Sequence, residues 1–141
     1  MATLNGVNRT KQAAGGSGDN YIASNEYAGV VKTIYDTIEV SGGATADVFA
    51  LPLIPAGSKV VGIYLAWDAL GTSSTVALGD ALSSGRYVAA TSSVSAGTTS
   101  TIALTGLNYE VGTTATDNAP LVTMTTSASL NGTVSAVIFY V

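Results

Sequence analysis

The side chains that most often carry out catalysis are missing from this sequence. It contains no histidine and no cysteine, which removes the commonest general base, the commonest metal ligand and every Ser-His or Cys-His nucleophile pair. The remaining candidates are its carboxylates: Asp19, Glu26, Asp36, Glu39, Asp47, Asp68, Asp80, Glu110 and Asp117. None of them forms the dense Asp-x-Asp cluster of a calcium loop. The sequence therefore predicts no catalytic, cofactor-binding or metal site, and we expect the protein not to be an enzyme.

Asp68 and Asp80 stand in the best-defined context of these carboxylates. Each follows a run of apolar residues and opens a polar turn, in WDALGTSS and GDALSSG respectively. An aspartate at such a position accepts hydrogen bonds from nearby backbone N–H groups, so we expect both residues to cap turns. A metal site and a glycosidase-like pair of carboxylates are the alternatives.

Both aspartates lie in the stretch SKVVGIYLAWDALGTSSTVALGDALSSGRYVAAT, residues 58–91, which indicates three strands separated by two turns. In the first strand, large apolar residues alternate with small or polar ones, and this period of two predicts one buried face. The expected inward residues are Val61, Ile63, Leu65 and Trp67. We expect Trp67 in the core; a sugar-binding site that uses its ring is the alternative.

Other segments rich in β-branched residues predict further strands. They span residues 27–40, 45–53, 101–104 and 121–126, with Ser41-Gly42-Gly43 as a turn after the first of them and Ile102 and Leu104 facing inward in the third. Near the carboxyl end, Asn131-Gly132 between apolar runs is typical of a two-residue hairpin turn. The closing strand is apolar on both faces, which predicts that the core covers one face and another subunit the other.

Short strands at this spacing, with no amphipathic helix, are typical of an antiparallel β-structure. We therefore predict an all-β fold, an antiparallel β-sandwich of about eight strands. A jelly roll is the first choice of topology, and an immunoglobulin-like sandwich is the alternative. Residues 26–141 are expected to form this single domain. Residues 1–25 are expected to form a flexible amino-terminal arm, because AAGGSGDN has the composition of a connector.

The composition limits the classes of partner. Charged residues make up 10% of the 141 residues, against about 25% in an average soluble domain, which favours assembly with other chains; a monomer kept soluble by serine and threonine is the alternative. A net charge of -4 with five basic residues excludes a nucleic-acid partner. No run approaches the about 18 apolar residues of a membrane span, and the amino end lacks the apolar core of a secretory signal. We therefore expect no membrane partner and no Sec-type export.

Two parts of the chain are candidates for partner binding. The arm carries Arg9 and Lys11, followed by the aromatic residues Tyr21 and Tyr27. The closing strand adds Ile138 and Tyr140. For the arm, the alternative is a loose terminus without a function.

The segments ALPLIPAGSKVVGIY, WDALG, TVALGD and GRYVAAT, within residues 47–91, resemble the capsid cementing or decoration proteins of tailed bacteriophages. The resemblance implies a jelly roll that binds the outside of an icosahedral shell at junctions between capsomers and stabilises it. It implies the major capsid protein as partner, a homo-oligomer (dimer or trimer), synthesis in the host cytoplasm and a place on the capsid exterior. A carbohydrate- or receptor-binding β-module of a phage tail or fibre is the alternative function.

Overall fold

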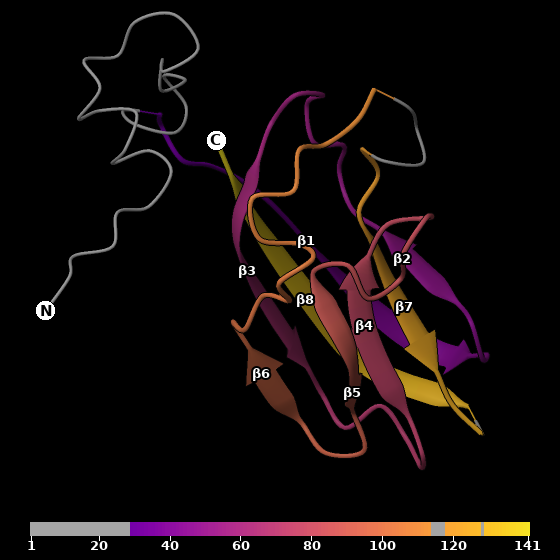
Figure 1. The fold of residues 1–141 in the computed structure, drawn as a ribbon. Coiled ribbons are helices and arrows are strands. Elements are labelled where there is room, and N and C mark those ends of the chain that lie inside the picture. Colours follow the sequence, from indigo (N-terminus) through magenta and orange to yellow (C-terminus); the bar gives the residue numbers. More distant parts are fainter. Residues whose placement is uncertain (1–28, 114–117, 128) are drawn as a thin grey trace, which may run out of the picture. The chain divides into compact units, whose positions relative to one another are not determined.

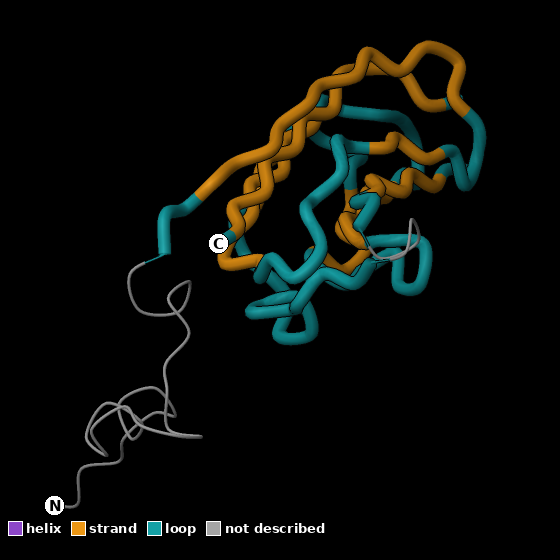
Figure 2. Tube along the Cα trace, turned by 90° about the horizontal axis from the view of Figure 1, so that it is seen from above, coloured by secondary structure: helices purple, strands orange, loops and turns teal. Residues whose placement is uncertain are grey.

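The computed structural model describes residues 29–113, 118–127 and 129–141. Within these ranges the chain forms strands and loops and no helix (Figure 2). The strands are β1 (Lys32–Gly43), β2 (Val48–Ala50), β3 (Val60–Trp67), β4 (Thr75–Gly79), β5 (Val88–Ser92), β6 (Gly97–Thr99), β7 (Leu121–Thr125) and β8 (Leu130–Tyr140). The predicted all-β class with about eight strands is confirmed.

The strands form two antiparallel four-stranded sheets (Figure 1), one in the order β1-β8-β3-β6 and one in the order β2-β7-β4-β5. β1 pairs with β8, β2 with β7, β3 with β6, and β4 with β5. These are the pairs that form when one long antiparallel hairpin is wound into two layers. The observed architecture is the expected antiparallel β-sandwich.

Side chains from both sheets fill one core. The first sheet contributes Leu65 and Ile138, the second contributes Leu78 and Val122, and all four are fully buried. Facing sheets pack about 10 Å apart, so the inward side chains of one sheet interdigitate with those of the other. This core holds the strands that position the loops at either end.

The set of inward-facing residues on β3 differs from the predicted set at one position. Ile63, Leu65 and Trp67 are buried as predicted, but Val60 is buried in place of Val61, which is only half-buried. The pairing with β8 shifts register between Val60 and Gly62. A bulge adds one residue on the strand, and the side-chain alternation therefore changes phase at this point.

The hairpin predicted at Asn131-Gly132 is wrong. β8 continues through both residues, which lie opposite Ser41 and Val40 of β1. The Asn131 side chain accepts a hydrogen bond from the Gly42 N–H at 2.9 Å, so it holds the ladder together instead of reversing the chain. The expected turn at 41–43 is wrong for the same reason, because β1 extends to Gly43 and the chain reverses after it.

The strand predicted at 101–104 is also wrong. The sixth strand, β6, lies earlier, at Gly97–Thr99, and Leu104 is exposed on the loop that follows it. The Ala103 N–H donates to the Tyr87 carbonyl oxygen at 2.7 Å. This segment is therefore held by the loop between β4 and β5 and not by a sheet.

Candidate partner-binding surfaces

The described residues contain no group of three or more Asp, Glu, His or Cys side chains that could hold a metal ion. The same residues contain no helix with the length and apolar character needed to cross a membrane. The remaining candidates for a functional site are the two aspartates, the loops and the outward faces of the sheets.

Asp80 caps its turn as predicted. Its Oδ1 accepts hydrogen bonds from the N–H groups of Leu82 at 2.9 Å and Ser83 at 2.8 Å. It also forms a buried ion pair with Arg86, which the sequence pattern did not reveal. The hydrogen bond to Asp80 raises the pKa of the Arg86 guanidinium above its already high ordinary value. Arg86 thus remains charged, and its partner is structural.

Arg86 links two loops that are distant in the sequence. Its guanidinium carbon lies 4.0 Å from the centre of the Tyr109 ring, at cation–π distance. Tyr109 in turn meets Tyr87 edge to face, with 6.3 Å between the ring centres. The loop 80–87 is therefore fixed against the loop 100–113.

Asp68 does not cap its own turn. Its Oδ2 accepts a hydrogen bond from the N–H of Thr133 on β8 at 2.9 Å, and its own N–H donates to the Thr133 carbonyl oxygen. Asp68 therefore secures the junction between β3 and β8. Asp68 directly follows β3 and Asp80 directly follows β4, so the two carboxylates lie at opposite ends of the sandwich and do not form a glycosidase-like pair.

Three loops meet at the end of the sandwich where β3 and β5 begin (Figure 1). They span residues 51–59, between β2 and β3; residues 80–87, between β4 and β5; and residues 100–113, the first of the two described parts of the segment between β6 and β7. Backbone hydrogen bonds join the first loop to the third: Gly57 N–H to Val111 O at 2.8 Å, and Val111 N–H to Ser58 O at 2.9 Å. The three loops therefore form one connected surface.

Exposed leucines gather on these loops. The exposed fractions are 61% for Leu53, 64% for Leu82, 89% for Leu104 and 43% for Leu107. We call these four residues and the loops that carry them the leucine end. Contiguous exposed apolar side chains on a protein are typical of an interaction site, whereas single ones are ordinary.

The described loops of the leucine end carry no excess charge. The charged residues of its described loops are Lys59, Arg86, Asp80 and Glu110, which sum to zero, while the whole chain carries -4. Two of the four, Asp80 and Arg86, neutralise each other directly. An apolar partner surface that docks here therefore meets no net charge on the described loops.

A second apolar surface lies on the outward face of the β1-β8-β3-β6 sheet. Tyr35 of β1, Val137 of β8 and Tyr64 of β3 stand side by side across three strands. Tyr35 is 75% exposed, Tyr64 is 43% exposed, and Val137 and Phe139 are half-buried. We call these four residues the outer face.

The structure places the predicted partner-binding residues of the closing strand in the core. Ile138 is fully buried and Tyr140 is 8% exposed, because residues of their parity on β8 point toward the facing sheet. The choice of these two side chains as surface contacts is therefore corrected, and the outward residues of the same strand are Val137 and Phe139. Arg9, Lys11, Tyr21 and Tyr27 lie outside the described residues.

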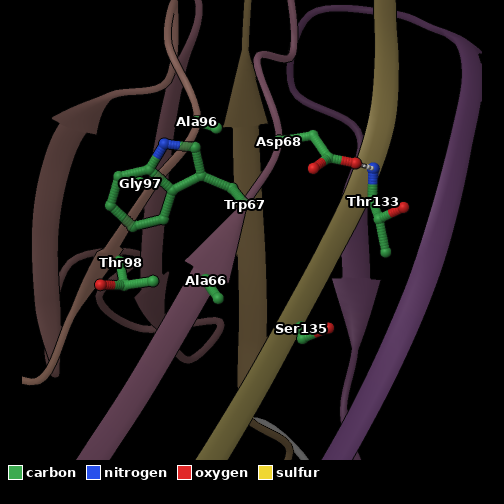
Figure 3. Close-up of a pocket in the computed structure, with 8 residues that line it drawn as sticks. All are labelled: Ala66, Trp67, Asp68, Ala96, Gly97, Thr98, Thr133 and Ser135. Atoms are coloured by element: carbon green, nitrogen blue, oxygen red, sulfur yellow. Dashed lines mark hydrogen bonds between the residues drawn. The ribbon is translucent and has the colours of Figure 1, made fainter.

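Trp67 borders a shallow hollow with a volume of about 390 Å³ on this sheet (Figure 3). Its ring packs against Gly97, where an added Cβ would lie 2.9 Å from the ring carbon Cζ2. Its Nε1–H donates to the Ser95 carbonyl oxygen at 3.1 Å, and only 7% of the residue is exposed. The ring offers no free face on which a sugar could stack, so the observation favours the core interpretation of Trp67.

Sequence reasoning missed the leucine end. It places Leu53 at the end of a strand and predicts that Leu104 faces inward. A signal was present at Leu82, which has Asp80 and Ser84 two positions away on either side and therefore no apolar neighbour with which to share a buried strand face.

The comparisons with known proteins concern the whole fold. No protein-family model matches the sequence, and no curated protein matches it. A chain of the cyanophage Pam1 capsid asymmetric unit has a TM-score of 0.64 and 27% identity, over 78% of this chain and 83% of that chain. A chain of the Ralstonia phage GP4 capsid has a TM-score of 0.61 and 19% identity, over 81% and 85%, and this likeness concerns the fold alone. The protein is thus similar in structure to chains of two phage capsids, which supports the resemblance to phage capsid-related proteins.

Proposed function

We propose that the protein is a structural virion protein that binds the outer surface of a phage capsid at capsomer junctions and cements the shell. Its partner in this proposal is the major capsid protein, and it is made in the host cytoplasm before it joins the capsid exterior. The observation that carries the proposal is the similarity to the chain of the cyanophage Pam1 capsid asymmetric unit, at 27% identity over 83% of that chain.

We also infer that the sandwich is a jelly roll. The sheet orders β1-β8-β3-β6 and β2-β7-β4-β5 follow when a hairpin with β4 and β5 at its tip is rolled up. Each strand then pairs with the strand at the same distance from the tip, and the two Greek keys of a jelly roll result. This topology is the one that the resemblance implies.

The surface properties support a binding role. The chain has few charges, and its described residues expose apolar side chains at the leucine end and on the outer face. A protein bound many times on one lattice needs only a modest affinity at each site, because linked contacts raise the overall avidity. We propose that it acts as a dimer or trimer, so that each oligomer bridges neighbouring capsomers.

Co-sedimentation tests this function. Full-length protein is mixed with empty shells assembled from the major capsid protein of the same phage, and the shells are then heated with and without it. We expect the protein to sediment with the shells and to raise the temperature at which they disassemble. Shells of an unrelated phage serve as the control. A protein that stays monomeric and unbound at high concentration would contradict the cementing role.

The same assay tests the arm. We propose that Arg9, Lys11, Tyr21 and Tyr27 add contacts to the shell, and deletion of residues 1–25 should then weaken co-sedimentation. Binding of glycans by the full chain, with no binding to shells, would instead favour the carbohydrate- or receptor-binding module of a tail or fibre.

A further inference from the structure

We propose that the leucine end is the surface that docks on the shell, and that its partner is a weakly charged, apolar patch of the major capsid protein. This inference rests on the proposed function and adds to it the orientation of the molecule. The sandwich would stand with the loops 51–59, 80–87 and 100–113 toward the shell and the opposite turns toward solvent.

The exposure of the leucines has no explanation within the described fold. Leu104 is 89% exposed, although its neighbours on the loop are fixed by hydrogen bonds: Ala103 N–H to Tyr87 O at 2.7 Å, and Thr105 Oγ1–H to Arg86 O at 2.9 Å. The two neighbouring residues are thus held, one by its backbone and one by its side chain, while the side chain of Leu104 remains exposed. A partner that covers such an apolar side chain lowers the free energy of the system, because it removes apolar surface from water.

The loops are arranged in advance of binding. An added Cβ on Gly106 would lie 2.6 Å from the Arg86 carbonyl oxygen, and one on Gly79 would lie 2.0 Å from the Ser83 carbonyl oxygen. The backbones of the loops 80–87 and 100–113 therefore touch at Gly106, and the ion pair between Asp80 and Arg86 fixes the loop 80–87 itself. Because little order has to be gained on docking, less binding energy is lost to conformational entropy.

The chain enters the sandwich at this same end. Lys32, the first residue of β1, lies opposite Tyr140, and Tyr140 lies opposite Val60, the first residue of β3. The loop 51–59 leads directly into that residue. β1 therefore begins at the leucine end.

Charge distinguishes the shell from other apolar partners. The charged residues of the described loops sum to zero, so these loops carry no net positive charge of the kind that attaches a protein to an anionic membrane surface. A second copy of the chain is the remaining alternative for this surface, and the oligomeric state of the free protein tests it.

Single substitutions in the full-length protein test the assignment. Leu104→Ser and Leu82→Ser remove exposed leucines from two of the three loops. Val94→Ser removes an exposed apolar side chain from the turn 93–96 at the opposite end, and Tyr35→Ser removes one from the outer face. The free energy of unfolding of each variant, measured in urea, shows that the fold is retained.

We expect Leu104→Ser and Leu82→Ser each to weaken binding to the shells about tenfold, as central contacts of an interface do, while Val94→Ser and Tyr35→Ser bind like the wild type. If the wild type binds and both leucine variants bind equally well, the docking surface is wrong and the cementing function stands. If the wild type does not bind, the proposed function fails first. A change in the oligomeric state of the free leucine variants, seen by analytical ultracentrifugation, would assign the surface to a second copy and overturn the inference.

Discussion

The two ends of the sandwich are built in different ways. At the leucine end the loops are long and are fixed by a buried ion pair, by backbone hydrogen bonds and by the contact of Arg86 with Tyr109. At the opposite end the turns 44–47, 68–74 and 93–96 are short, and hydroxyl and carboxylate groups of the first two bond to neighbouring backbone. The difference indicates that the first end presents a shaped apolar surface and the second mainly closes the fold.

Disrupting the ion pair should have the largest effect on stability. Asp80→Ala removes the acceptor for two turn N–H groups and leaves the Arg86 guanidinium, whose side chain is 16% exposed, without its carboxylate. We expect a loss of about 4 kcal/mol in the free energy of unfolding, measured by urea denaturation. Glu110→Ala, at an exposed carboxylate of the same end, is the control and should change stability by less than about 0.5 kcal/mol.

A double variant sharpens this prediction. Arg86→Met added to Asp80→Ala removes the uncompensated charge. The free energy of unfolding of the double variant should therefore fall by less than the sum of the losses in the Asp80→Ala and Arg86→Met single variants. Additive losses of stability would show that Asp80 and Arg86 stabilise the fold independently and not as a pair.

A smaller effect is expected at the opposite end. The Ser74 hydroxyl donates to the Gly71 carbonyl oxygen at 2.7 Å and accepts from the Ser93 hydroxyl at 3.0 Å, and both serines are buried. Ser74→Ala removes the acceptor of a buried hydroxyl, and we expect a loss of about 1.5 kcal/mol. Ser92→Ala, at an exposed serine of β5, should be neutral in the same denaturation. Equal losses would mean that this buried pair has no special role.

The smallest effect on stability is expected where the proposed effect on binding is largest. Leu104→Ser changes a side chain that is 89% exposed, so the free energy of unfolding should change by less than about 0.5 kcal/mol. A loss above about 1.5 kcal/mol would show that Leu104 supports the fold, and the contrast between the two ends would then disappear.

Much of the strand pattern was predictable because it depends on neighbours in the sequence. Alternation placed Ile63, Leu65 and Trp67 on the buried face of β3. The antiparallel sandwich followed from the number and spacing of such runs. The lack of histidine and cysteine likewise limited the chemistry, because the set of available side chains does not depend on how the chain folds.

The errors occurred where a residue's environment comes from distant parts of the chain. Asn131-Gly132 has the composition of a turn, yet β8 lies between β1 and β3, and pairing on both sides keeps the strand extended through these residues. Gly132 adopts a φ of 133°, which glycine tolerates without the strain that other residues incur. The ladder hydrogen bonds therefore outweighed the local turn preference.

By itself, then, the sequence determined the all-β class, the approximate number of strands and the absence of the usual catalytic side chains, since these depend on residue type and on a period of two. The tertiary structure alone decided which apolar residues remain uncovered. Both parities of the closing strand are apolar, but only the facing sheet selects Ile138 for the core and leaves Val137 and Phe139 half-buried. Likewise, only the meeting of three loops brings exposed leucines to one end, because burial depends on which segments share a volume and not on their order in the chain.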